Sequence, residues 1–374
     1  MFYTSKPIFK GFSFLLCAAL FVATFFPTCA FAASVEKPDI IYLNEQPDKV
    51  FENLSENSNS YQASIDGIKT KIPKNSEDPV ESILEDGDKI SLSFPQEIDA
   101  GKGELEDGVV QYDSDDDVKL YSQVETETVG KESFISNRIM TQIENPQAPK
   151  EYTYTFNMPT GYRLVSDVTY NGEMRKDLLS KKGDILESGV SAADFEKLLE
   201  KYEESFGEVY VVDDKNIVRQ IIEKPWAKDA NGNDVFTKYT ISENSLVQHV
   251  SFDENTAFPV LADPKVGTTK SFSVKISNES MGLPSLSIST LTTFAKKKIK
   301  TKVKNKIISV VGSKFVPGLN IASTVAAIFA YINYLTGKKG VKVYGSMKYV
   351  RHYIHKGGYY IYAWDIKSIN ISRY

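Results

Sequence analysis

The sequence predicts a mainly β protein: one antiparallel sandwich, or two in tandem, with one inserted helix, followed by a small α+β C-terminal module. Three observations lead to this fold class. Short strand-like segments recur between turn residues, a single stretch among these segments has helical periodicity, and the composition changes abruptly near residue 293. With 374 residues, 41% of them hydrophobic, the chain is long enough for about two domains with their own cores.

The first 32 residues have the pattern of a secretory signal peptide. Lys6 and Lys10 supply the positive charge that precedes the charge-free apolar run Gly11–Phe26. Ala30–Ala32 then forms an A-x-A cleavage site. A membrane anchor is the alternative, because the apolar run approaches the length of a span. Pro27 before the small residues favours cleavage, so we expect a protein that is secreted or associated with the cell envelope.

Both cysteines, Cys17 and Cys29, lie in this leader. Phe26–Thr28 is a poor match to a lipoprotein cleavage box, so lipid anchoring is not expected. The mature chain would then have no disulfide, no thiol nucleophile and no cysteine-bound zinc. An exported, cysteine-free chain suits a Gram-positive bacterium.

Residues 33–60 are polar and acidic and are expected to be flexible, and the acidic β-rich region spans residues 61–266. Polar and apolar residues alternate in Lys89–Phe94, which is typical of a strand with one face in water. Asp213–Asn216 and Asn231–Asp234 have the composition of hairpin turns. The expected strands are Tyr61–Pro73, Lys89–Phe94, Val118–Thr126, Ser133–Ile143, Tyr152–Asn157, Glu208–Val212, Ile217–Ile222, Val235–Ser242, Leu246–Phe252 and Ala257–Leu261.

One helix is expected among these strands. Ser191–Asp194 resembles a capping box, apolar residues recur on one face from Phe195 to Phe206, and Gly207 can end the helix. An aromatic stripe at this spacing is typical of a helix that packs against a core.

Residues 267–293 are rich in Ser and Thr, which indicates a linker or a loosely packed strand region. The charge separates at the same place. Residues 33–290 carry 26 Lys and Arg against 48 Asp and Glu, whereas residues 291–374 carry 16 Lys and Arg against Asp365 alone. This asymmetry predicts that the basic, Tyr-rich module, residues 294–374, is an interaction surface.

The segment Lys296–Ile307 has two interpretations, because its lysines alternate as on a strand while its Ile and Val residues are spaced as on a helix. The apolar stripe continues beyond the lysines and favours the helix. Residues 315–337 carry no charge and include a second expected helix; its length permits a membrane span, but its Pro and Asn residues favour a buried helix. Four short strands, with a hairpin turn at His355–Gly358, would complete the module: Val341–Tyr344, Met347–Tyr353, Tyr359–Trp364 and Ser368–Ser372.

The module combines positive charge with flat aromatic rings, which suits an anionic cell-wall polymer or a membrane surface. In the alternative interpretation the rings form the core of the small module, and the lysines face the acidic region of the same chain. Nucleic acid is not expected as a partner of an exported protein. The candidate binding residues are Lys296, Lys297, Lys298, Lys300, Lys302, Lys304, Lys306, Tyr359, Tyr360, Tyr362 and Trp364.

One acidic loop is a weak candidate for calcium. Asp113, Asp115 and Asp117 alternate as calcium ligands do, but Val118 and Val124 stand where an EF-hand needs Gly and Glu. The loop therefore fails as an EF-hand.

The three histidines, His249, His352 and His355, do not have the spacing of a zinc site, and no nucleophile elbow accompanies them. Phosphate loops and dinucleotide fingerprints are absent from the sequence. No cofactor, catalytic residue or firm metal site is expected.

A resemblance rests on Pro225–Gly232, which reads PWAKDANG, and on Phe258–Pro264, which reads FPVLADP. Together with Ala148–Tyr152, these stretches resemble a pattern that recurs in secreted, largely uncharacterised proteins of Gram-positive bacteria. In that family a PWAxDAxG turn precedes strands that end in PVxADP. The resemblance covers about Lys89–Pro264 and implies export and a β-rich fold, with no known activity; the helix near Asp194 would be an insertion.

These observations favour an exported, non-enzymatic protein whose basic C-terminal module binds anionic wall polymer or a membrane surface. One alternative is a membrane-active antimicrobial or toxin module released from an acidic pro-region by proteolysis near residues 267–293. Another is a secreted hydrolase that uses carboxylates, for which the sequence singles out no residue pair.

Overall fold

The computed structural model describes residues 49–51, 53–114, 117–129, 132–187, 191–200, 202–203, 205–281, 340–354 and 359–374, together with Thr301, Asn305 and Ser309. All of these belong to one compact unit that begins at Ile41. The expected signal peptide, residues 1–32, lies outside the described residues, as does most of the acidic segment 33–60.

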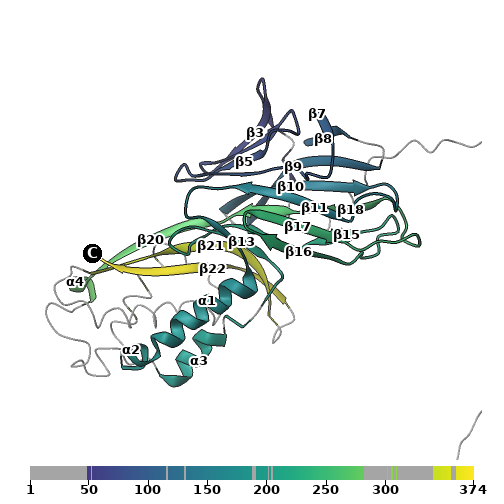
Figure 1. The fold of residues 1–374 in the computed structure, drawn as a ribbon. Helices are drawn as coiled ribbons and strands as arrows, with labels where there is room; N and C mark the ends of the chain where they lie inside the picture. The colour runs from purple at the N-terminus through teal and green to yellow at the C-terminus, as the bar shows by residue number, and fades with distance from the viewer. Residues whose placement is uncertain are drawn as a thin grey trace, which may run out of the picture. The chain divides into compact units, whose positions relative to one another are not determined.

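Two antiparallel sheets make up most of the unit (Figure 1). The first has the order β12-β13-β14-β19-β10-β9-β8-β7, with β1 beside β9 and the pair β15-β18 beside β10; the second has the order β16-β17-β11-β6-β5-β4-β3-β2. The strands of the first sheet are β1 (Lys49–Val50), β7 (Ala100–Glu106), β8 (Val109–Ser114), β9 (Val118–Val129), β10 (Glu132–Ile143), β12 (Arg163–Ser166), β13 (Val209–Val212), β14 (Val218–Ile222), β15 (Trp226–Lys228), β18 (Val260–Asp263) and β19 (Lys265–Thr268). Those of the second are β2 (Ser55–Glu56), β3 (Ser60–Ile65), β4 (Ile68–Pro73), β5 (Val80–Ile83), β6 (Lys89–Leu92), β11 (Glu151–Asn157), β16 (Thr237–Ser242) and β17 (Ser245–Val250).

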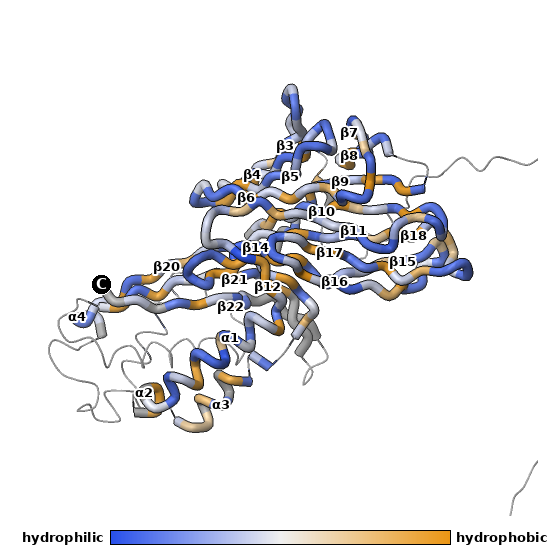
Figure 2. The backbone as a smooth tube through the Cα atoms, in the orientation of Figure 1, coloured by the Kyte–Doolittle hydropathy of each residue, from blue (hydrophilic) through white to orange (hydrophobic). Residues whose placement is uncertain are grey.

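The two sheets share one hydrophobic core, as in a β-sandwich. On β11, Tyr152, Tyr154 and Phe156 are buried while the residues between them are more exposed, and Ile139 of β10 belongs to the same cluster. The hydroxyl groups of Tyr154 and Thr141 lie 3.2 Å apart and join the two sheets inside this core. Figure 2 shows the alternation of hydrophobic and hydrophilic residues along the strands.

The structure places three helices between β12 and β13 where one was expected: α1 (Asp167–Ser180), α2 (Lys182–Glu187) and α3 (Ala192–Glu200). α1 begins after Ser166, whose hydroxyl accepts the N–H of Thr169. Its Tyr170 is buried and packs edge-on against Tyr210 of β13, with ring centroids 5.5 Å apart. Met174 and Leu178 follow Tyr170 at spacings of four and eight residues on the same face, and Met174 packs against the same cluster. This short stripe among polar residues was not recognised as a helix in the sequence.

A third sheet contains the C-terminal strands in the order β20 (Lys270–Ser277), β21 (Gly340–Ile354) and β22 (Tyr359–Arg373), and β20 leads into the short helix α4 (Asn278–Met281). Only Thr269 separates β19 of the sandwich from β20. The four short C-terminal strands that were expected are thus two long ones. At Gly345 a side chain is sterically excluded, because a Cβ there would lie 2.0 Å from the carbonyl oxygen of Ser368.

Of the two expectations for residues 267–293, a linker or a loosely packed strand region, the strand region is found up to Ser277, so the linker is wrong there. Along β20, Phe272, Val274 and Ile276 are buried. The residues that alternate with them, Ser271, Ser273 and Lys275, face water. The high Ser content therefore belongs to the wet face of a paired strand and does not indicate a linker.

The predicted fold class is confirmed: an antiparallel β-sandwich with inserted helical structure, followed by a C-terminal sheet. Each expected strand overlaps an observed one, and Tyr61–Pro73 is a hairpin of β3 and β4 with its turn at Asp66-Gly67. The helical hairpin expected in the C-terminal module falls mainly outside the described residues.

Candidate functional site

The seven candidate lysines between Lys296 and Lys306 lie outside the described residues. In the same stretch Thr301, Asn305 and Ser309 are described, and all three are helical and exposed. Their spacing of four residues puts them on one helix face, which agrees with the helical interpretation at those positions. Residues 315–337, for which a membrane span was considered, also lie outside the described part.

Trp364 is not available as a surface ring. Its side chain is only 4% exposed, and its ring centroid lies 5.0 Å from that of Tyr349 and 5.9 Å from that of Phe134. Phe134 belongs to β10, so this aromatic cluster is a place where the C-terminal sheet packs against the sandwich. The expectation that Trp364 contacts a ligand is therefore corrected, because the ring is part of a core. The candidate tyrosines of Tyr359–Tyr362 lie on β22, but their side chains are not described.

Two lysines of the C-terminal sheet face each other on one surface. Lys275 of β20 and Lys342 of β21 are register partners, and Ser372 of β22 continues the same row. The Nζ atom of Lys275 lies 5.6 Å from the ring centroid of Tyr374, and that of Lys342 lies 5.3 Å from Tyr344. Like charges directly opposite on neighbouring strands destabilise a sheet, although the aromatic rings offset part of the repulsion. An anion between the two ammonium groups would remove it.

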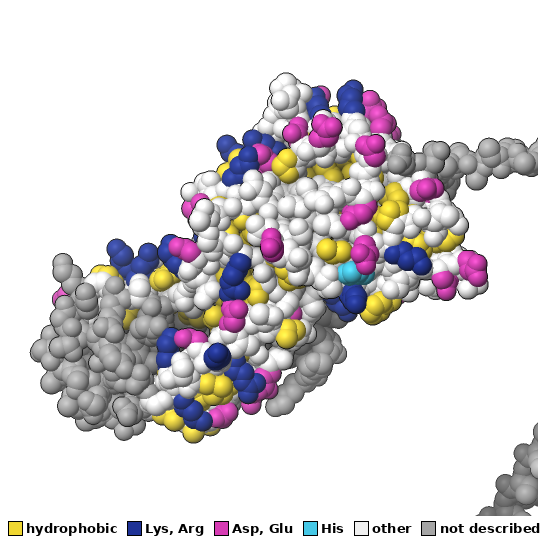
Figure 3. All heavy atoms as spheres, viewed as in Figure 1, with side chains coloured by type: hydrophobic (Ala, Val, Ile, Leu, Met, Phe, Trp, Pro, Cys, Tyr) yellow, Lys and Arg dark blue, Asp and Glu magenta, His cyan; other side chains and the backbone are white. Residues whose placement is uncertain are grey.

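Sequence reasoning missed this pair, because it assigned Lys275 to a linker and gave Lys342 no partner. In the space-filling view of Figure 3, Lys and Arg side chains gather over β20, whereas acidic side chains are scattered over the sandwich. The register of β20 and β21 is what brings the two lysines together.

Two other lysines of the C-terminal sheet are held by carboxylates of the sandwich. Lys348 Nζ lies 3.2 Å from Glu223 Oε1, and Lys367 Nζ lies 3.4 Å from Glu208 Oε2. The lysine side chains are 15% and 10% exposed, so water screens these pairs only weakly. Burial acts against the charge of Lys348, yet Glu223 and Glu127 hold its pKa above the usual value. Part of the charge asymmetry is thus neutralised within the chain.

A buried charged cluster lies next to these pairs. The Arg138 guanidinium donates to Glu125 and to Asp263, and Lys265 Nζ lies 3.2 Å from Glu125 and 3.4 Å from Glu223. Burial raises the pKa of Asp263 to about 7, with Arg138 acting in the opposite direction. Burial also lowers the pKa of Lys265 to about 7; Glu125, its nearest carboxylate, is shared with Arg138. The cluster can therefore exchange protons near neutral pH.

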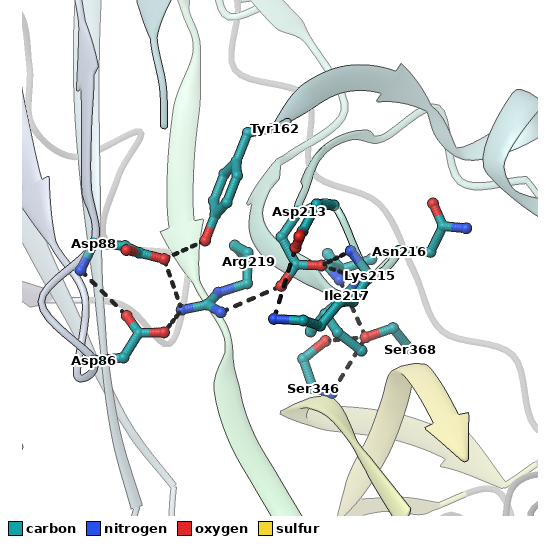
Figure 4. A network of polar contacts seen from close by, with 12 residues as sticks. Asp86, Asp88, Tyr162, Asp213, Lys215, Asn216, Ile217, Arg219, Ser346 and Ser368 are labelled. Carbon is teal, nitrogen blue, oxygen red and sulfur yellow. Dashed lines mark hydrogen bonds and ion pairs between the residues drawn. The ribbon is translucent and has the colours of Figure 1, made fainter. Parts of the chain in front are cut away.

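Arg219 of β14 joins the two sheets of the sandwich (Figure 4). It forms ion pairs with Asp86 and Asp88, in the turn between β5 and β6, and with Asp213 at 3.4 Å. Burial acts against its charge, but Asp86 and the other groups around it raise the pKa of Arg219. Three carboxylates around one guanidinium make this a fixed structural junction.

The C-terminal sheet is also joined to β14 by hydroxyl groups, as Figure 4 shows. Ser346 and Ser368 are buried with their Oγ atoms 2.6 Å apart, and Ser368 Oγ accepts the N–H of Val218 at 3.1 Å. Because the backbone N–H of Val218, the first residue of β14, donates to a side chain of β22, docking of the hairpin satisfies a backbone group that would otherwise be buried without a partner.

The acidic loop does not assemble a calcium site among the described residues. Asp113 lies near the end of β8, Asp115 is outside the described part, and Asp117 accepts the side-chain N–H of Asn145 at 2.6 Å. In the part of the chain that the structure describes, no three His, Cys, Asp or Glu side chains are grouped to hold a metal ion.

His249 lies between a hydroxyl group and a carboxylate. Its Nε2 is 2.8 Å from Thr240 Oγ1, and its Nδ1 is 3.0 Å from Glu151 Oε1. Glu151 is 66% exposed, so the row faces water and resembles a cross-strand polar ladder more than a protected catalytic triad. His352 lies on β21 without a described side chain, and His355 is outside the described residues.

The stretch that carries the family resemblance has a structural role. Trp226 begins β15, and its ring lies 5.8 Å from the guanidinium carbon of Arg138. In the turn that follows, Asp229 Oδ1 accepts the N–H groups of Asn231 and Asn233 at 2.9 and 2.8 Å. Hydrogen bonds led by that from the Asn233 side chain lower the pKa of Asp229. The motif therefore closes a turn and covers the buried arginine.

None of the described helices combines the length and the apolar character that crossing a membrane requires. Compared with protein-family models, with curated proteins and with solved structures, the chain matches none of them. The resemblance to secreted Gram-positive proteins stays a prediction from the sequence.

Proposed function

We propose that the protein is a non-enzymatic binding protein whose basic C-terminal module attaches to an anionic cell-wall polymer or membrane surface outside the cell. The acidic sandwich acts as the scaffold that holds this module. The observation that supports the proposal is the directly opposed pair of Lys275 and Lys342 on the C-terminal sheet.

Four of the lysines of the C-terminal sheet fall into two groups. Lys348 and Lys367 face carboxylates of the sandwich and are neutralised there. Lys275 and Lys342 have no ion-pair partner among the described residues, and Lys275 is exposed to water. Of these two groups, the second retains charge for an external anion, and repulsion within the pair makes anion binding favourable.

The test uses the full chain and two anionic probes, vesicles of phosphatidylglycerol and phosphatidylcholine and a purified wall polyphosphate polymer. Binding is measured by co-sedimentation while salt is raised from about 0.05 to about 0.5 M, because attraction between exposed charges is screened over this range. We expect binding to one or both probes, and we expect this binding to weaken as salt is raised. Failure to bind either probe, or binding that ignores salt, would contradict the proposal.

A matched pair of double variants locates the site. Lys275→Gln/Lys342→Gln should weaken binding by roughly thirtyfold, given about 1 kcal/mol for each of the two phosphate-type contacts. Lys102→Gln/Lys215→Gln changes the net charge equally at exposed lysines of the sandwich and should have little effect. Equal losses in both variants would show that only net charge matters and would remove the C-terminal sheet from the proposal.

The pairing of Lys348 with Glu223 and of Lys367 with Glu208 favours a second candidate, a cationic module kept neutral by an acidic pro-region. A cut after Met281 would leave β21 paired with β20 over Lys270–Ser277, so the module would stay bound until those pairs separate. Mass spectrometry of culture supernatant tests this. Recovery of the mature chain in one piece only would exclude processing as the route to activity.

A further inference from the structure

A groove of about 710 Å³ lies where the end strands of the two sandwich sheets meet. β12 is the end strand of the first sheet and β16 that of the second. The groove is lined by consecutive residues of both, Arg163–Ser166 of β12 and Thr237–Ile241 of β16, and by the start of α1, Asp167–Thr169. Because neighbouring side chains of a strand point to opposite faces, a surface lined by consecutive residues is the edge of the strand.

The free edge of β16 presents backbone groups to this groove. The N–H of Ser251 donates to the C=O of Phe236 at 2.9 Å, which identifies the even-numbered residues of this strand as those bonded to β17. The N–H and C=O groups of Thr237, Tyr239 and Ile241 therefore point away from β17. No backbone hydrogen bond of these groups to another described residue is found.

Exposed apolar side chains surround the groove. Four large hydrophobic side chains of the described part are exposed, and three of them lie in or beside the lining: Phe236 (68%), Val168 (62%) and Phe206 (57%). Scattered single hydrophobic residues are ordinary on a protein surface, but a cluster beside an open strand edge is typical of an interaction site.

The unpaired charges of the groove are positive. Lys224 and Lys238 line it and have no ion-pair partner among the described residues. The acidic lining residues are already engaged, since buried Asp167 accepts the N–H of Gly207 at 3.0 Å and Glu208 pairs with a lysine of β22. A partner with carboxylates would therefore be attracted and one with ammonium groups repelled.

We propose that this groove binds an extended acidic peptide segment of another protein, which adds to β16 as a further strand. Backbone hydrogen bonds to Thr237, Tyr239 and Ile241 supply affinity, and alternate side chains meet the lysines and the exposed apolar residues. This site is separate from the C-terminal sheet, so the inference does not depend on the proposed function.

The test uses two fluorescein-labelled peptides of equal length and pattern, acetyl-EVEFEVE-amide and acetyl-KVKFKVK-amide, with the full chain. Fluorescence anisotropy should give at least tenfold tighter binding of the acidic peptide, in keeping with two lysines facing its carboxylates. Amide hydrogen exchange should slow at Thr237, Tyr239 and Ile241 when it binds. No binding of the acidic peptide, or binding that leaves these three amides unprotected, would overturn the proposal.

Two variants at one position separate the strand edge from the side chain. Ile241→Pro removes an N–H that points away from β17, so the sandwich keeps its own hydrogen bonds, whereas Ile241→Val keeps the N–H. Ile241→Pro should weaken binding roughly fivefold or more, the value of about one hydrogen bond, and Ile241→Val should bind like the original chain. Equal affinities would overturn the proposal.

Lys224→Gln/Lys238→Gln should reduce the preference for the acidic peptide without removing protection of the three amides. A second copy of this chain could also occupy the edge of β16. Analytical ultracentrifugation without peptide tests this by measuring whether the chain self-associates. Self-association that Ile241→Pro abolishes would assign the edge to a homodimer and overturn the peptide proposal. If Ile241→Pro lowers stability, the exchange experiment on the unchanged chain still decides.

Discussion

Lys275 and Lys342 lie directly opposite each other on β20 and β21, each beside a tyrosine ring. We predict that Lys342→Gln raises the free energy of unfolding by about 0.2–1 kcal/mol at low ionic strength, because it removes repulsion between like charges. Urea unfolding followed by circular dichroism measures the difference, which should shrink in about 0.5 M salt. A gain that is equally large at high salt would show that the lysines do not repel each other.

The raised pKa of Asp263 makes stability depend on pH. Between the ordinary value of 3.8 and about 7 the folded chain keeps a proton that the unfolded chain has lost, so this residue lowers stability as pH rises through that window. Asp263→Asn cannot ionise. The stability of this variant relative to the original chain should therefore increase between pH 4 and 7, by roughly 2–4 kcal/mol. Urea unfolding across this range checks the slope, and a constant difference would contradict the shift.

Lys265 should act at higher pH with the opposite slope. Its pKa is lowered from 10.5 to about 7, so above pH 7 the unfolded chain holds a proton that the folded chain has released, and stability rises with pH. Lys265→Met, which keeps the length of the side chain without its charge, should lose this rise between pH 7 and 10. The same slope in variant and original chain would show that the amine keeps its charge through its contacts with Glu125 and Glu223.

Trp364→Ala should cost about 3–5 kcal/mol, the usual loss for a fully buried aromatic ring. The ring packs on Tyr349 and on Phe134 of the sandwich, so its removal should loosen the C-terminal sheet in particular. Hydrogen exchange at the Val218 amide, which donates to Ser368, reports this loosening directly. Trp226→Phe is the matched control, since that ring is only half-buried, and it should leave Val218 protected.

Asp167→Ala should cost about 2–3 kcal/mol, because the buried carboxylate accepts the N–H groups of Phe206, Gly207 and Glu208 and would leave them unsatisfied. Ser166→Ala removes only the helix cap of α1 and should cost about 1 kcal/mol. Thermal unfolding of both variants gives the comparison. Equal losses of stability would mean that the Asp167 carboxylate contributes no more than the single capping hydrogen bond of Ser166.

The strands of the sandwich could be predicted from the sequence because their pattern is local. In β11 every second residue is buried, so the period of two is visible without knowledge of any partner. α1 was missed because its apolar stripe is short, with only Tyr170, Met174 and Leu178 at helical spacing. Its cap and the contact of Tyr170 with Tyr210 both involve residues outside the helix.

The candidate site was harder to predict because its geometry depends on distant residues. Whether Trp364 is exposed is decided by Phe134, and whether Lys348 keeps its charge for an external ligand is decided by Glu223. The groove beside β16 depends on two sheet ends meeting, which no local pattern encodes. Charge counting identified the unusual half of the chain but could not divide its lysines into paired and free ones.

The single residue between β19 and β20 has a consequence for how the chain is made. Synthesis runs from the N-terminus, so β20 is present beside the sandwich before the ribosome reaches Gly340, where its partner β21 begins. During that interval β20, which carries the apolar Phe272, Val274 and Ile276, lacks its partner strand. A nascent chain that stalls there exposes an unpaired strand edge that can pair with another chain and aggregate. Chaperones would therefore act before the last hairpin, β21 and β22, pairs with β20.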